Sequence, residues 1–127
     1  MATWADSAFK YRIPISIPVF TGGGATNIDV QVDVTPDWDV FWTNIQSNFF
    51  DIKLFSANAE TEIAYQRQSG ANFANRTLVL ELDNVAIDDQ SSTSLVYLYF
   101  GDSSASSDPT TSFTVSSPKT GYIWIGR

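Results

Sequence analysis

The carboxylates are the side chains of this sequence with the clearest chemical potential, because two pairs of them lie close together. Asp37 and Asp39 form one pair, and Asp88 and Asp89 form the other. A glycoside hydrolase needs two carboxyl groups roughly 5 to 10 Å apart across a cleft, one of them acting as an acid. The sequence places neither pair across a cleft, and Asp37 and Asp39 have a simpler role at the start of a helix. We therefore interpret both pairs as structural.

The residue types that most enzymes use for proton transfer and nucleophilic attack are missing. The chain has 127 residues, with no His and no Cys. These absences remove the commonest general base, thiol catalysis, disulfides and the usual zinc ligands. Ser and Thr hydroxyls have no His to activate them, and the Gly run at residues 22–24 is not followed by the Lys and Ser or Thr of a phosphate loop. We predict a protein that is not an enzyme and that needs no cofactor.

Calcium is the metal that the composition leaves open, because the polar loops of β-sandwiches supply oxygen ligands. The candidate ligands are Asp88, Asp89, Asp102 and Asp108, all in polar segments. The sequence lacks the dense Asp-x-Asp-x-Asp-Gly spacing of a calcium loop. Solvated acidic loops are therefore the simpler interpretation, with calcium binding as the alternative.

Aromatic residues make up 14% of the chain, and most of the rings must pack in the core of so small a domain. Trp4 and Trp124 are the rings that core packing explains least. We predict an assembly interface formed by Trp4, Tyr122, Trp124 and Ile125, in which these side chains bury apolar area against a neighbouring copy.

Carbohydrate binding is the alternative use of the aromatic residues. It would need exposed rings on which a sugar could stack, and Trp38 and Trp42 are the candidates. The simpler interpretation is that both rings are buried and that their helix closes one end of a sandwich.

The charge balance limits the kinds of partner. Seven Lys and Arg residues stand against 14 Asp and Glu residues, which gives a net charge of −7 at pH 7. Seven scattered cations cannot form a phosphate-neutralising patch, which argues against nucleic acid and anionic membranes. No stretch approaches the roughly 20 apolar residues that cross a bilayer. The first residues also lack the cationic and apolar regions of a signal peptide, so we expect synthesis in the cytoplasm.

Most of the chain alternates apolar and polar residues with the period of two that is typical of half-buried strands. Residues 28–34 show this most clearly, and Leu78, Leu80 and Leu82 share one face of another segment. Strands are predicted at residues 11–19, 28–34, 51–55, 62–67, 76–82, 94–100 and 120–126, and a long loop at residues 101–112.

Three of these segments have a predicted place in a sheet. Residues 11–19 contain Pro14 and Pro18, which cannot donate to a ladder, so they read as an edge strand or a strand start. Residues 94–100 are almost continuously apolar, which is typical of a central strand covered on both faces. Residues 51–55 and 62–67 are separated by a short polar turn and predict a hairpin.

The segment after residue 34 has the spacing of a helix. Thr35 can serve as N-cap, with Pro36 in the first helical position. Trp38, Phe41, Trp42 and Ile45 then fall on one face, at the three- and four-residue spacing of an amphipathic helix.

Together these elements predict a single domain over residues 1–127, because two independent cores would not fit. The predicted fold is an all-β, antiparallel, jelly-roll-like β-sandwich with one short helix near residues 36–46. Residues 118–127 are a candidate strand for assembly with a neighbour.

The order of the segments resembles a known family, the domain of unknown function numbered 2341, found in bacterial and archaeal surface proteins and in phage proteins. The most specific stretch is Thr-Ser-Leu-Val-Tyr-Leu-Tyr-Phe-Gly-Asp at residues 93–102, followed by Ser-Ala-Ser at residues 104–106. Weaker matches, in the family's order, are Trp4 with residues 11–17, residues 51–55 after the helix, and Ile-Ala-Tyr at residues 63–65. The resemblance implies a β-sandwich that often accompanies sugar-binding modules, and it implies no established activity.

From these observations we expect a structural or assembly protein. Family members are usually modules of long exported proteins, whereas here the domain begins at its own Met1. We therefore expect a small phage virion component, such as a capsid decoration or tail accessory protein. Its partners would be further copies of itself and other virion proteins. A carbohydrate-binding module on a virion or cell surface is the alternative, with a surface glycan as partner and calcium as a candidate ion.

Overall fold

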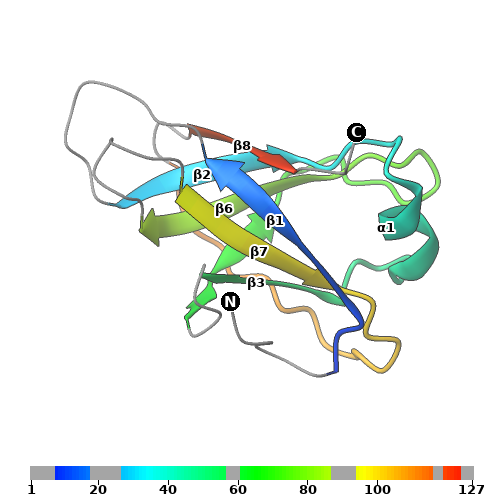
Figure 1. Cartoon of the computed structure of the whole chain (residues 1–127). Coiled ribbons are helices and arrows are strands. Elements are labelled where there is room, and N and C mark those ends of the chain that lie inside the picture. Colours follow the sequence, from blue (N-terminus) through cyan, green and yellow to red (C-terminus); the bar gives the residue numbers. More distant parts are fainter. Residues whose placement is uncertain (1–7, 18–26, 57–60, 87–93, 116–118, 124–127) are drawn as a thin grey trace.

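The computed structural model describes residues 8–17, 27–56, 61–86, 94–115 and 119–123, which form strands and one short helix (Figure 1). Their bounds are β1 Tyr11–Ile17, β2 Asn27–Asp33, α1 Asp39–Asn44, β3 Ile52–Ser56, β4 Glu62–Ile63, β5 Tyr65–Arg67, β6 Val79–Ala86, β7 Ser94–Phe100 and β8 Lys119–Ile123. The strands pair in the order β4-β3-β7-β1-β8-β2-β6-β5.

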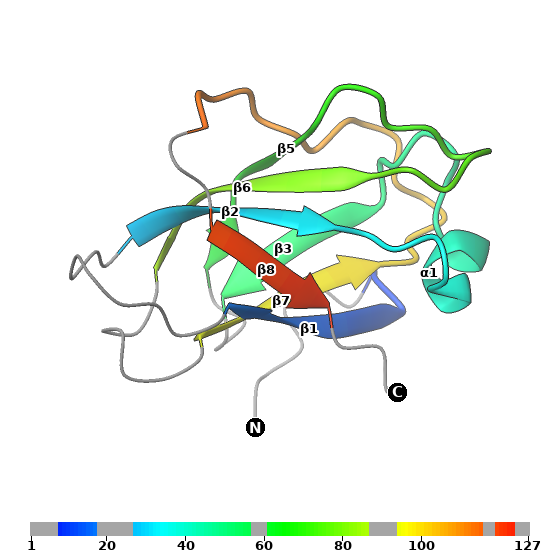
Figure 2. The ribbon, with the colours of Figure 1, turned by 90° about the horizontal axis from the view of Figure 1, so that it is seen from above.

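The strands form two antiparallel layers that β8 joins along one side. One layer contains β4, β3, β7 and β1, and the other contains β2, β6 and β5. Figure 2 shows β1 and β7 on one side of the molecule and β6 and β5 on the other, with β8 running between them. β8 pairs antiparallel with β1 and parallel with β2. The predicted all-β sandwich with one short helix is confirmed, with this parallel contact added.

The other side of the sandwich is joined by β4 and β5. The predicted return strand at residues 62–67 divides at Ala64, so that β4 completes the predicted hairpin with β3 while β5 pairs with β6. The Asp83 N–H donates to the carbonyl of Ala64 at 2.8 Å. One short segment therefore belongs to both layers.

The core lies between the layers and consists of the apolar sides of the strands whose side chains the structure describes. Leu78, Leu80 and Leu82 are fully buried, as their alternation predicts. Ile15, Val30, Val32, Leu54 and Leu98 are likewise without exposed surface. β7 lies between β3 and β1, so its predicted central position is confirmed.

Helix α1 closes one end of this core, but it begins later than the sequence predicts. Trp38 is the N-cap residue and makes no side-chain capping bond. The Thr35 hydroxyl instead accepts a hydrogen bond from the Asp37 N–H at 3.2 Å, so Thr35 and Pro36 form a turn before the helix. The predicted capping role of Thr35 is wrong because this turn intervenes.

Strand β1 is not the simple edge strand that its prolines predict. It pairs with β7 along its whole length, and Ile15 and Ser16 also pair with β8 on the other side. Ile15 and Ser16 therefore lie between two neighbouring strands, directly after Pro14 in the sequence.

Residues 101–115 form a long loop that contains the one predicted at residues 101–112, and they cover the end and one edge of the sandwich. The Thr111 N–H donates to the carbonyl of Tyr65 at 2.8 Å, beside β5. The side-chain amide of Gln46 donates to the carbonyls of Asp102 and Ala105, each at 2.9 Å. These contacts fix the loop against both layers.

Candidate functional site

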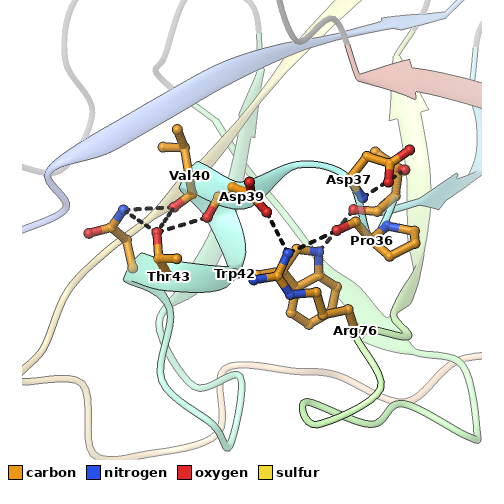
Figure 3. A network of polar contacts seen from close by, with 9 residues as sticks. Pro36, Asp37, Asp39, Val40, Trp42, Thr43 and Arg76 are labelled. Atoms are coloured by element: carbon orange, nitrogen blue, oxygen red, sulfur yellow. Dashed lines mark hydrogen bonds and ion pairs between the residues drawn. The ribbon is translucent and has the colours of Figure 1, made fainter.

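The two tryptophans of the sugar-binding alternative lie in the core. Trp38 is 7% exposed and Trp42 is 3% exposed. The Trp38 ring stacks on Phe41 at a centroid distance of 5.0 Å. The Trp42 indole N–H donates to the carbonyl of Thr35 at 2.9 Å (Figure 3). Neither ring faces solvent for stacking on a sugar, and the simpler interpretation, that both are buried, is the correct one.

Within the carboxylate pair at the helix, Asp39 has a structural role. Asp39 forms an ion pair with Arg76, whose guanidinium also donates to the carbonyl of Pro36 at 3.1 Å (Figure 3). Arg76 has a positive φ of 52° and lies in the loop before β6. The ion pair therefore holds that loop against the turn that precedes α1.

The calcium candidates are not brought together in the part of the chain that the structure describes. Asp88 and Asp89 lie outside the described residues. Asp102 accepts a hydrogen bond from the Ser104 N–H at 3.0 Å, and Asp108 pairs with Arg67 at 2.7 Å. Among the described side chains, no group of three or more Asp, Glu, His or Cys could hold a metal ion.

Asp108 is held as a carboxylate by its neighbours. Partial burial alone would raise the pKa of Asp108, but the Arg67 guanidinium and the N–H and hydroxyl of Thr110 outweigh it and lower the pKa. A carboxylate already engaged in this way serves to anchor residues 101–115 to β5.

The predicted assembly residues are placed only in part. Trp4, Trp124 and Ile125 lie outside the described residues. Tyr122 belongs to β8, where its backbone pairs with Ser16 of β1. Residues Lys119–Ile123 thus pair with β1 and β2 in the domain's own sheet, and the assembly role of residues 118–127 stays a prediction.

A buried carboxylate that the sequence analysis did not single out lies at the end of the sandwich beside α1. Asp51 has no exposed surface. Its Oδ1 accepts the Gln46 N–H at 3.0 Å, and its Oδ2 has no hydrogen-bond partner. Burial raises the pKa of Asp51, and Asp102 adds to this effect, while the backbone N–H groups of Gln46, Asp51 and Gly101 oppose it.

The most distinctive surface is the outer side of the β1, β7 and β3 layer. Arg12, Lys53, Phe55 and Tyr97 are half-buried on it, next to the fully buried Tyr99. We call these five residues the aromatic face. Their positions alternate with the core residues of the same strands, so all five side chains point away from the core.

The arginine of the aromatic face is held by two tyrosine rings. Its guanidinium carbon lies 4.7 Å from the ring centroid of Tyr97 and 5.9 Å from that of Tyr99. The guanidinium also donates to the Tyr99 hydroxyl at 3.0 Å. Each ring contributes a cation–π attraction, and the hydrogen bond fixes the direction of the side chain.

Further rings surround this pair. Phe55 meets Tyr99 edge-on at a centroid distance of 5.1 Å, and Phe9 does so at 6.2 Å. The Lys53 ammonium lies 5.8 Å from the centroid of Phe9. An open hollow of about 330 Å³, lined by Phe9, Lys53, Glu62 and Asp102 among others, adjoins the face.

The aromatic face was not predicted, because residues 94–100 were interpreted as a strand covered on both faces. On the outer side of this strand Tyr99 is indeed fully buried, whereas Tyr97 is half-buried. The signal that could have revealed the aromatic face is which residues of β1, β3 and β7 occupy outward-facing positions. Positions 12, 53, 55, 97 and 99 all oppose the core phase of their own strands, and all five carry an aromatic ring or a cation. Which strands are neighbours, and hence which of these residues meet, does not follow from that phase.

Comparison of the chain with protein-family models, with curated proteins and with solved structures gives no match. The resemblance drawn from the sequence therefore stays a prediction. Within the described part of the chain, no helix is long and apolar enough to cross a membrane.

Proposed function

We propose that this protein is a non-enzymatic structural component that assembles through its aromatic face. The observation that carries the proposal is the placement of Arg12 against Tyr97 and Tyr99 on the outer side of a sheet, where the core does not need it. Tyr and Arg are the residue types that carry most of the binding energy in protein interfaces. Since the Arg12 side chain is already ordered by these contacts, a partner would lose little side-chain entropy on binding it.

The more specific part of the proposal is a phage virion component that forms homo-oligomers and contacts other virion proteins. Its support is the family resemblance of residues 93–106 together with the lack of His and Cys. The net charge of −7 would keep free subunits soluble before assembly.

Truncation of Tyr97 tests the proposal. In Tyr97→Ser, we expect the self-association constant to fall by about 5- to 30-fold, since loss of an interface aromatic costs about 1–2 kcal/mol. Light scattering over a concentration series measures this. Val40→Ser is the control, because Val40 is an exposed apolar residue of α1, at the end of the sandwich and off the aromatic face. A mass of 14.0 kDa for the unaltered chain at every concentration would contradict the proposal.

Carbohydrate binding is the second candidate, now on the aromatic face instead of on Trp38 and Trp42. The observation that favours it is the half-buried Tyr97 and Phe55 rings beside the cations Arg12 and Lys53. Titration calorimetry against an oligosaccharide panel, with and without calcium, tests this candidate. Heat that saturates with one sugar and disappears in Tyr97→Ser would favour it, and a silent panel would remove it.

A further inference from the structure

The two outer sides of the sandwich carry opposite kinds of charge. The outer side of β2 and β6 presents Asp29, Asp33, Glu81 and Asp83, which we call the acidic face. These positions alternate with the buried Val30, Val32, Leu80 and Leu82. Among the Lys and Arg side chains that the structure describes, none occupies an outward position of β2 or β6.

On the acidic face, the described contacts of the Glu81 carboxylate come from neutral donors. Glu81 accepts hydrogen bonds from the side-chain amides of Gln66 and Gln68, at 2.9 Å and 3.4 Å. These donors are neutral, so they orient the carboxylate without cancelling its charge. Asp33 at the end of β2 is exposed.

The acidic and aromatic faces belong to opposite layers, which Figure 2 shows at the two sides of the molecule. On the aromatic face, Arg12 and Lys53 are the described cations, and Glu62 belongs to β4 at the edge of the same layer. If two copies met through the same face, charges of the same sign would lie together. If the aromatic face of one copy meets the acidic face of another, cations lie against carboxylates.

We infer that the acidic face of one copy of this chain binds the aromatic face of the next, so that copies assemble head to tail. This inference rests on the proposed function and names the surface that the partner presents. An interface between two different faces is heterologous, and it produces a ring if the rotation closes or a filament if it does not. The Tyr97 and Phe55 rings supply apolar contact area, and the opposed charges set the orientation.

Two variants, each disabling one face, test the inference by light scattering. Arg12→Ser with Tyr97→Ser removes the aromatic face, and Asp33→Lys with Asp83→Lys reverses charge on the acidic face. We expect each variant alone to have the 14.0 kDa mass of one chain. An equimolar mixture should form pairs of twice that mass, since each pair retains one intact interface. Asp37→Lys, an exposed charge reversal in the turn before α1, should assemble like the unaltered chain.

The outcomes separate the inference from the proposed function. If the aromatic-face variant is monomeric while the acidic-face variant still assembles, the inference is wrong and assembly through the aromatic face stands. If the unaltered chain is itself monomeric at every concentration and ionic strength, the proposed function fails. The single variants Tyr97→Ser and Asp33→Lys repeat the test with smaller changes, and circular dichroism confirms that each variant is folded. Head-to-tail assembly should also weaken by at least tenfold between about 0.05 M and about 0.5 M salt, because the screening length shortens.

Discussion

Asp51 shows how a single buried side chain can hold a loop in place at a cost in stability. Its carboxylate receives the Gln46 N–H, while Oδ2 is buried without a partner. The sequence gives no sign of this, because Asp51 begins an ordinary strand pattern and its burial depends on residues 101–105, which are distant in sequence. Tyr65 is another buried side chain whose polar contact the sequence does not predict. Its hydroxyl donates a hydrogen bond to the carbonyl of Ile52 at 2.6 Å.

The raised pKa of Asp51 predicts a specific pH dependence of stability. The folded chain binds this proton more tightly than the unfolded chain, so the contribution of Asp51 to stability falls as the pH rises through its raised pKa. In Asp51→Asn this dependence is lost. As the pH falls from about 7 to about 4, the free energy of unfolding of the unaltered chain should therefore rise relative to that of Asp51→Asn. Urea unfolding of both proteins across this range measures the difference, and a difference that does not change with pH would contradict it.

Gly101 offers a second prediction at this scale. Its φ is +93°, and a Cβ there would lie 2.7 Å from Cδ2 of the Tyr11 ring. Gly70 has a similar φ of +96° but open space around it. Gly101→Ala should therefore lose about 1–3 kcal/mol of unfolding free energy, and Gly70→Ala about 1 kcal/mol, since only the first adds a steric clash to backbone strain. Equal losses in thermal or urea unfolding would show that the Tyr11 ring moves aside at no cost.

Among the elements, the strands with clear alternation could be predicted, and their partners could not. The period of two places residues 30–34 and 78–82 with the correct side inward because each strand has one buried side. The sequence cannot show that β8 lies between β1 and β2, since that depends on contacts across about 100 residues of chain. The start of α1 was misplaced for a local reason, because the turn at Thr35 uses the hydroxyl that would otherwise cap the helix.

The position of β8 predicts the effect of removing it. Without residues 119–127, Ile15 and Ser16 of β1 and residues 30–32 of β2 lose their pairing partner, and the seam between the layers opens. The truncated chain should lose several kcal/mol of unfolding free energy, more than the ~1 kcal/mol typical of one substitution. Urea unfolding followed by near-UV circular dichroism measures the loss. An unchanged midpoint would mean that β8 contributes nothing to the domain and is available to a neighbour.

For the whole molecule, the fold accounts for a surface with two chemically different sides. The sandwich needs only the inward residues of β1, β3 and β7 for its core, which leaves their outward positions available for Arg12, Tyr97 and their neighbours. The composition predicts binding or assembly in place of catalysis, and the aromatic face is the surface to which we assign that role in our proposal. Since the aromatic face is built from three strands far apart in sequence, no local motif could reveal it.

The measurement that tests this account most directly is a dilution series of the unaltered chain followed by nuclear magnetic resonance. If the aromatic face is the contact between copies, the signals of the Arg12 guanidinium and the Tyr97 ring should shift or broaden as the concentration rises. Signals of α1, which lies at the end of the sandwich, should stay unchanged. Concentration-dependent changes confined to α1, or no change at any residue, would contradict the claim that this protein assembles through its aromatic face.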